Sequence, residues 1–263
     1  MKIYISADIE GVAGVTAWEE TLANGRGYAE ACRQMTAEVN AACEAAFAAG
    51  ATEIVVKDAH DTARNLDHSA LPAGVSLYRG WSGHPSGMIE GLDSSFDGVI
   101  FVGYHSAAGS GGNPLAHTMT TDLDEVTLNG MQCDELLLHG WLAAHLQVPL
   151  LMVTGDAELC RVAEERYPGM VTVPVKEGHG NGLLNLHPET ALERIREGVK
   201  TALNREIPVL DLPERFRLEV RYSKQHRAYR ASFYPGCYLQ DAKTVIYETE
   251  DYGELIRCQH FIL

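Results

Sequence analysis

The stretch Lys2-Ile3-Tyr4-Ile5-Ser6-Ala7-Asp8-Ile9-Glu10-Gly11 begins with a hydrophobic run that stops at two carboxylates. Three further hydrophobic runs also precede a side chain able to bind metal: Ile54–Val56 before His60, Val99–Gly103 before His105, and Val148–Val153 before Asp156. Helix-length segments separate these runs, which is typical of parallel strands in alternating β and α units. Because open parallel sheets bind ligands beyond the carboxyl ends of their strands, the sequence predicts a functional site along one sheet edge.

The length and charge of the chain limit its class. Its 263 residues fit one large α/β domain, alone or with a small partner domain. The net charge of -15 argues against nucleic acid or an anionic membrane as the partner, since both attract basic patches. No run approaches the roughly twenty apolar residues of a membrane span. The chain starts directly with a strand and not with a signal peptide, so we expect a cytoplasmic protein.

The six cysteines show no C-x-x-C pair and no short-spaced framework. This pattern indicates neither a disulfide scaffold nor a thiolate zinc site. Cys32 and Cys43 fall on one apolar face of a predicted helix, so we expect reduced thiols in the core.

The helical segments have clear boundaries. The sequence predicts a long helix over residues 28–49, ended by Gly50, and further helices over 135–146, 157–167 and 188–203. Asp156 directly precedes the third of these, so a helix cap is favoured over a metal ligand there. Residues 77–79 are expected to form an edge strand, and Asn129-Gly130 predicts a tight hairpin turn after the strand 126–128.

The composition changes after Pro208 and Pro213. An alternating strand over residues 218–222, a second over 243–247 and a terminal helix over 252–261 follow. We therefore predict an α/β fold with two regions. Residues 1–205 form a metal-binding three-layer α/β/α domain around a mostly parallel sheet, and residues 206–263 form a smaller C-terminal α+β region.

Asp8 and Glu10 are two residues apart, which on a strand places both side chains on one face. Two such carboxylates repel each other unless a cation lies between them, and a divalent metal is the usual solution. Together with His60, His105 and Glu135 they form an oxygen and nitrogen set that suits zinc or manganese. Taken alone, the two carboxylates could equally cap a helix or pair with lysines, and Asp58 is expected to orient a neighbouring ligand.

Several ordered motifs together resemble one known family. They are Ser6-Ala7-Asp8-Ile9-Glu10-Gly11, the Asp58-x-His60 pair, residues 91–98, Val102-Gly103-Tyr104-His105, Ala116-His117-Thr118-Met119, Glu135, and Val153-Thr154-Gly155-Asp156. This combination is similar to the zinc D-aminopeptidases encoded with bacterial dipeptide permeases, over residues 1 to about 203. Lys176-Glu177 before Gly178 also resembles a family segment near the pocket, although a plain surface pair is as good an interpretation.

The resemblance implies two zinc ions per subunit. Asp8 would bridge them, Glu10 and His60 would complete one side, and His105 and Glu135 the other. His117 matches the position of the family's catalytic histidine. The resemblance further implies a homo-oligomer, with pentameric rings stacked into a decamer.

The implied reaction is hydrolysis of the N-terminal residue of short peptides, in particular peptides containing D-residues. A zinc pair lowers the pKa of a bridging water from about 15.7 towards neutrality, so the resulting hydroxide could attack the carbonyl. His117 follows the glycine-rich loop 106–114, which is expected to be mobile, and it suits an acid/base or electrostatic role better than a nucleophilic one. The alternatives are another dinuclear metallohydrolase, such as an amidase or phosphoesterase, and a metal- or peptide-binding module without turnover.

Overall fold

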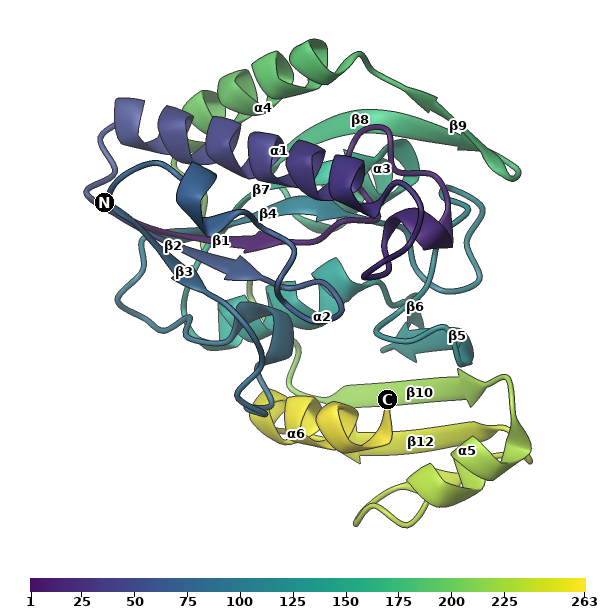
Figure 1. Cartoon of the computed structure of the whole chain (residues 1–263). Helices are drawn as coiled ribbons and strands as arrows, with labels where there is room; N and C mark the ends of the chain where they lie inside the picture. The colour runs from purple at the N-terminus through teal and green to yellow at the C-terminus, as the bar shows by residue number, and fades with distance from the viewer.

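The computed structural model describes all 263 residues and contains a seven-stranded sheet with the order β3-β2-β1-β4-β7-β8-β9 (Figure 1). Six strands are parallel, and β9 is antiparallel to β8. The strands are β1 Lys2–Ala7, β2 Glu53–Asp58, β3 Val75–Tyr78, β4 Gly98–Tyr104, β7 Leu150–Asp156, β8 Val171–His179 and β9 Gly182–Asn185. The predicted mostly parallel sheet is confirmed, and β3 is the predicted edge strand.

Helices cover both faces of this sheet (Figure 1). One face carries α1 Tyr28–Ala48 and α4 Pro188–Leu203, whose apolar residues share a core with the inner strands. The opposite face carries α2 Glu135–His145 and α3 Ala157–Arg166. Central strands such as β4 are buried along their whole length, because helices cover both sides of the sheet. The predicted three-layer α/β/α arrangement is therefore present.

A second, five-stranded sheet has the order β11-β12-β10-β5-β6. Its members are β5 Leu123–Leu128, β6 Met131–Gln132, β10 Phe216–Tyr222, β11 Tyr238–Leu239 and β12 Thr244–Thr249, with α5 Gln225–Ala231 and α6 Tyr252–Ile262 beside them. Asn129 and Gly130 both have positive φ angles, of 52° and 77°, as the predicted hairpin turn requires. The second sheet thus takes two strands from before residue 206.

The two sheets share one hydrophobic core. Trp141 on α2 packs edge-on against Phe216 on β10, with ring centroids 5.9 Å apart, and Tyr252 on α6 contacts both rings. The hydroxyl of Tyr252 also donates to the carbonyl of Leu138 on α2, at 2.7 Å. A division of the chain at about residue 206 therefore remains a proposal, and the hairpin β5–β6 lies on the N-terminal side of it.

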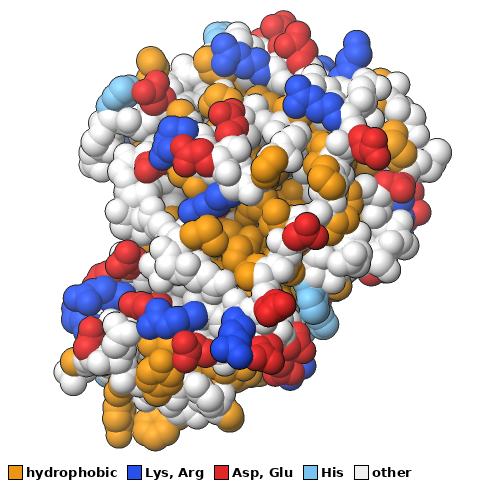
Figure 2. Space-filling view, turned by 180° about the vertical axis from the view of Figure 1, so that it is seen from behind, with side chains coloured by type: hydrophobic (Ala, Val, Ile, Leu, Met, Phe, Trp, Pro, Cys, Tyr) orange, Lys and Arg blue, Asp and Glu red, His pale blue; other side chains and the backbone are white.

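Charged side chains of both signs lie on the surface. On the face opposite to that of Figure 1, lysine and arginine side chains are interspersed with aspartate and glutamate, and hydrophobic side chains are exposed between them (Figure 2).

All six cysteines are free thiols, as the sequence predicts. None of the helices is both long enough and apolar enough to cross a membrane.

Candidate metal centre

The site lies where the strand order of the large sheet reverses. The chain builds outward from β1 through β2 to β3, then returns to place β4 on the other side of β1. In open parallel sheets, ligands bind beyond the carboxyl ends of the strands at such a reversal of strand order. Asp8 and Glu10 follow β1, and His105 follows β4.

Two glycines let these two loops touch. The Gly11 N–H donates to the carbonyl of Gly103 at 2.7 Å, and a Cβ atom on Gly11 would lie 1.8 Å from the Tyr104 carbonyl oxygen. Gly103 has a φ of 73°, and a Cβ atom there would lie 2.3 Å from the Asp8 carbonyl oxygen. Any larger side chain at either position would push the two loops apart, so both glycines are needed to bring the ligand-bearing loops together.

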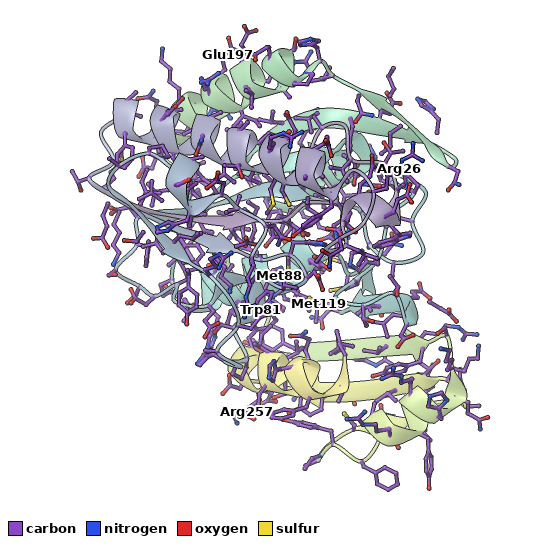
Figure 3. All side chains as sticks on the ribbon, viewed as in Figure 1. Arg26, Trp81, Met88, Met119, Glu197 and Arg257 are labelled. Atoms are coloured by element: carbon purple, nitrogen blue, oxygen red, sulfur yellow. The ribbon has the colours of Figure 1, made fainter.

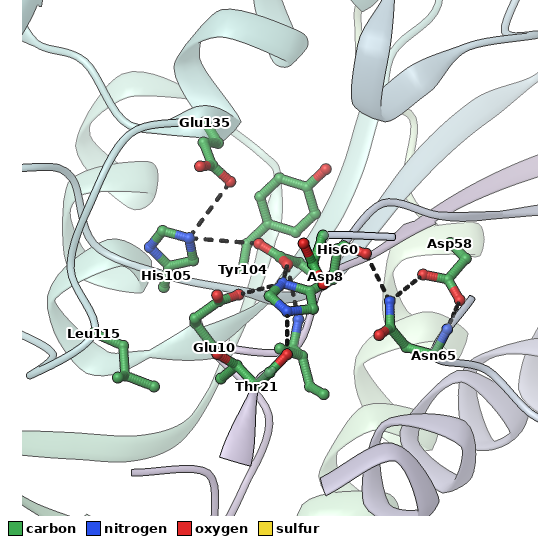
Figure 4. Close-up of polar contacts among 12 residues, drawn as sticks. Asp8, Glu10, Thr21, Asp58, His60, Asn65, Tyr104, His105, Leu115 and Glu135 are labelled. Atoms are coloured by element: carbon green, nitrogen blue, oxygen red, sulfur yellow. Dashed lines mark hydrogen bonds and ion pairs between the residues drawn. The ribbon is translucent and has the colours of Figure 1, made fainter. Parts of the chain in front are cut away.

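Backbone carbonyls orient both predicted ligand imidazoles. His60 Nε2 lies 2.8 Å from the Thr21 carbonyl oxygen, and His105 Nδ1 lies 2.9 Å from the Ser106 carbonyl oxygen. Each of these nitrogens must donate, because a carbonyl oxygen only accepts. The other nitrogen of each ring then faces the carboxylates (Figure 4). Histidine ligands of metals are held in this way by a hydrogen bond from the nitrogen that does not bind the ion.

Asp8 lies between the two imidazoles (Figure 4). Its Oδ1 is 3.2 Å from His60 Nδ1, and its Oδ2 is 3.4 Å from His105 Nε2. Glu10 Oε2 is 3.1 Å from His60 Nδ1 on one side, and Glu135 Oε2 is 3.4 Å from His105 Nε2 on the other. The single carboxylate of Asp8 therefore faces two sets of potential ligands with its two oxygens.

The charges in this cluster shift one another's proton affinity. Burial alone would lower the pKa of His60, but Glu10 and Asp8 outweigh it and raise that pKa well above its ordinary value. Glu135 and Asp8 do the same for the pKa of His105. Burial favours the neutral form of Asp8, yet the two histidines hold its pKa well below the ordinary range. The cluster as a whole attracts positive charge.

Two buried atoms in the cluster lack hydrogen-bond partners: Glu10 Oε2 and His105 Nε2. Unpaired buried polar atoms are uncommon and costly, so their convergence needs an explanation. Ligand atoms of Asp8, Glu10 and His105 lie within 4.8 Å of one another, as do those of His105, His117 and Glu135. Oxygen and imidazole donors at such spacing fit a zinc ion.

His117 lies beside this cluster. Its ring stacks on that of His105, with centroids 4.4 Å apart and planes 9° apart, and the indole of Trp18 contacts it edge-on. Its Nδ1 lies 3.0 Å from the Leu115 carbonyl oxygen, so Nε2 is the nitrogen that faces Glu135, at 3.7 Å. Glu135 is held in turn by the Met119 N–H, which donates to its Oε1 at 2.6 Å. A free imidazole nitrogen therefore borders the cluster.

The structure thus brings together all six residues singled out in the sequence: Asp8, Glu10, His60, His105, His117 and Glu135. Asp156 is the N-cap of α3, as predicted, and its side chain accepts from the Leu159 N–H at 2.9 Å. Asp58 does not face the cluster. It accepts three hydrogen bonds from Asn65 and Leu66, and the Asn65 amide donates to the carbonyl of His60 at 2.7 Å.

The site opens into a pocket of about 340 Å³. Its apolar walls are Trp18, Leu22, Trp81, Met88 and Met119. Of these, the sequence singled out only Met119, which belongs to the motif of residues 116–119. Trp81, Met88 and Met119 lie close together between the large sheet and the second sheet (Figure 3), although they are far apart in the chain.

The glycine-rich loop 106–114, for which the sequence predicts mobility, is largely packed against the protein in this structure. Ser106, Ala107, Ala108 and Asn113 are buried. The Asn113 amide donates to the Glu10 carbonyl at 3.0 Å, and the Ser106 N–H donates to Asp156 at 2.8 Å. The Asn113 bond connects the loop that precedes His117 to the loop after β1, and the Ser106 bond connects it to the start of α3.

Comparisons with known proteins agree with this geometry. The sequence model of the D-aminopeptidase family matches residues 1–261. A D-aminopeptidase of Bacillus subtilis (strain 168) is 32% identical over 251 residues, which cover 94% of this chain and 90% of that protein. A solved structure, described as the Zn-dependent D-aminopeptidase DppA from Bacillus subtilis, a self-compartmentalizing protease, superposes with a TM-score of 0.94 at 29% identity, covering 100% of this chain and 96% of that one. The chain therefore belongs to the D-aminopeptidase family of peptidases.

Proposed function

We propose that this protein is a binuclear zinc aminopeptidase that removes the N-terminal residue of short peptides, with D-residues as its preferred substrates. The family membership supports the peptidase class, and the name of DppA supports zinc. The observation that carries the two-ion proposal is the position of Asp8, whose two oxygens face His60 and His105 separately.

In this proposal Asp8 would hold both zinc ions. Glu10 and His60 would complete one side, and His105 and Glu135 would complete the other. Bound zinc supplies Lewis-acid activation of water and of the peptide carbonyl. The chain fixes the direction of each ligand, because Thr21 and Ser106 hold the imidazoles through their second nitrogens.

The role proposed for His117 is proton transfer at Nε2. The Leu115 carbonyl fixes its tautomer, and stacking on His105 fixes its ring plane. Its partly exposed position in the pocket wall leaves Nε2, which carries no proton in this tautomer, within reach of a substrate, where it can take a proton from the attacking water and then give it to the leaving amine. The apolar walls around it would limit the access of water and hold the substrate side chains.

Substrate and metal assays test this function. Zinc-loaded protein is incubated with the anilides of D-alanine and L-alanine and with a phosphodiester, and Glu10→Gln serves as the control for dependence on the site. Release from the D-anilide alone is the expected result. Release from neither anilide would refute the peptidase, L-preference would refute the stereochemistry, and cleavage of the phosphodiester would favour the phosphoesterase alternative. Metal analysis of the purified protein should give two zinc ions per chain.

The His117→Ala variant tests the proton-transfer role. We expect full zinc content and a loss of turnover of about 10²- to 10⁴-fold, which is typical for removal of a general acid or base. His179→Ala, at an exposed histidine outside the pocket, is the control. Turnover near that of the wild type would exclude a catalytic role, and loss of zinc would make His117 a ligand.

We also propose that the chain forms a homo-oligomer of pentameric rings stacked into a decamer, and that it works in the cytoplasm. DppA, the solved structure that it matches, is described as self-compartmentalizing, which supports assembly. Native mass spectrometry gives the subunit number directly, and a monomer at micromolar concentration would contradict the proposal.

A further inference from the structure

Lys176 is a buried lysine, and none of the contacts described above for the metal cluster involves it. It lies on β8 and is only 3% exposed. The sequence left two interpretations open for Lys176-Glu177, a segment near the pocket and a plain surface pair, and in the structure only Glu177 is at the surface. Buried lysines are rare because desolvation of an ammonium group is costly, so Lys176 must gain compensating contacts.

Those contacts are backbone carbonyl oxygens of the loop that follows β1. The Lys176 ammonium donates to the carbonyls of Glu10, Val12 and Val15, the last two at 3.0 Å and 2.8 Å. An ammonium group has three N–H bonds, so all of its donors are used on one loop. Lys176 therefore gathers three carbonyls of one loop, and it is the hydrogen-bond donor to the Val15 carbonyl, while the Glu10 and Val12 carbonyls also accept from the Asn113 amide and the Val15 N–H.

Other groups fix the same loop. The Asn113 amide donates to the Glu10 carbonyl at 3.0 Å, and Glu38 on α1 accepts from the Ala13 N–H at 3.0 Å. These two groups hold one carbonyl and one N–H, whereas Lys176 spans the loop from Glu10 to Val15. Of the side chains that hydrogen-bond to the backbone of residues 10–15, Lys176 is the one that holds more than one residue, and one of these residues is Glu10, whose side chain faces His60.

We propose that Lys176 is a positioning residue for Glu10: by holding the Glu10, Val12 and Val15 carbonyls, it keeps the Glu10 carboxylate at His60 and so raises the zinc affinity of that side of the site. This inference rests on the proposed role of Glu10 as a zinc ligand. It assigns no proton transfer and no substrate contact to Lys176.

The test is the zinc affinity of Lys176→Met, measured by competition with a chromophoric chelator on folded protein. Outer-shell groups that orient metal ligands typically contribute about 10- to 100-fold in metal affinity, and we expect a loss in that range for the more weakly bound ion. Circular dichroism and thermal melting establish that the variant is folded. If the methionine variant does not fold, Lys176→Gln, which retains two N–H donors, is measured with the same expected direction.

Lys57→Met is the matched control. Lys57 is also a buried lysine on a parallel strand, and its ammonium donates to the backbone carbonyl of Gly80 and lies 4.0 Å from the centre of the Trp81 ring. It touches no part of the loop after β1. If the role of Lys176 is purely structural, Lys176→Met should behave like Lys57→Met. Both variants should then melt at a lower temperature than the wild type and bind zinc with unchanged affinity.

The outcomes separate this inference from the proposed function. Wild-type zinc affinity in a folded Lys176 variant, together with weakened binding in Glu10→Gln, would overturn the inference alone. Unchanged zinc binding in Glu10→Gln, or no zinc binding by the wild type, would overturn both. Weakened binding in the Lys176 variant but not in Lys57→Met supports the positioning role.

Discussion

The buried carboxyl group of Glu38, which holds the loop after β1, should make the stability of the protein depend on pH, and this dependence can be measured. Glu38 Oε1 accepts from the Ala13 N–H at 3.0 Å and from the Gln34 amide at 3.1 Å, and Glu38 Oε2 has no partner. Burial raises the pKa of Glu38 from its ordinary value of 4.5 to about 7, although the Gln34 and Ala13 hydrogen bonds and the charge of Lys176 oppose the rise. Glutamine at this position would keep an oxygen to accept both bonds and would not ionise.

The sign of the effect follows from proton linkage. Because the folded state raises the pKa, Glu38 contributes its full stability below about pH 4.5 and loses it as the pH rises through about 7. The advantage of Glu38→Gln over the wild type should therefore grow by about 2 kcal/mol between roughly pH 5.5 and pH 8, towards a limit of about 3 kcal/mol for a shift of this size. Glutamine should thus stabilise the protein most in alkaline buffer.

Urea denaturation of both proteins across this pH range measures the difference. Subtracting the two curves removes the titration of groups that do not interact with Glu38, whereas the titration of Lys176, whose charge acts on Glu38, contributes to the difference. Glu44→Gln is the control, since Glu44 is on the same helix but its side chain is 55% exposed. A difference between Glu38→Gln and the wild type that does not change with pH would refute the proposed burial of an ionised carboxylate.

Three further predictions concern the site. Asp58→Ala removes the acceptor for the Asn65 and Leu66 N–H groups and should lower the free energy of unfolding by about 3 kcal/mol; an unchanged urea midpoint would contradict this. Gly11→Ala places a methyl group against the Tyr104 carbonyl, so activity and melting temperature should both fall, and wild-type values for both would show that the loops can part without effect. Zinc should bind more tightly as the pH rises from about 6 to 8, since zinc must displace protons from His60 and His105, whose pKa values are raised in the metal-free cluster; a calorimetric titration in two buffers that finds no proton release would disprove the displacement.

Local sequence pattern was enough to predict the strands and helices that form the edge of the large sheet where the candidate metal site lies. Each of β1, β2 and β4 is a short apolar run that ends just before its polar residue, and parallel strands bring those ends to one edge whatever their separation in the chain. Asp8, His60 and His105 could therefore be placed from the sequence. Glu135 could not, because its position at the start of α2 is also typical of an ordinary solvated glutamate.

Long-range pairing accounts for what the sequence did not predict. Strand β8 contains Pro174, which normally argues against a strand in the interior of a sheet. Here Pro174 pairs with Gly155 of β7 on one side, while β9 joins only from Lys176 onward, so the other side is still an edge at that point. The hairpin turn at Asn129-Gly130 was predictable, but its partner β10 lies about ninety residues further along the chain.

The inclusion of β5 and β6 in the second sheet has a consequence for the order in which the protein folds. Strand β5 pairs with β10, and α2, which begins with Glu135, packs its Trp141 against Phe216. As the ribosome releases the chain from its N-terminus, the β5 edge and the apolar side of α2 have no cover until residues 216–262 emerge. The first strands can assemble early, but the helix that carries Glu135 can complete its packing only after these residues have emerged, so we expect Glu135 to join Asp8, His60 and His105 late in synthesis.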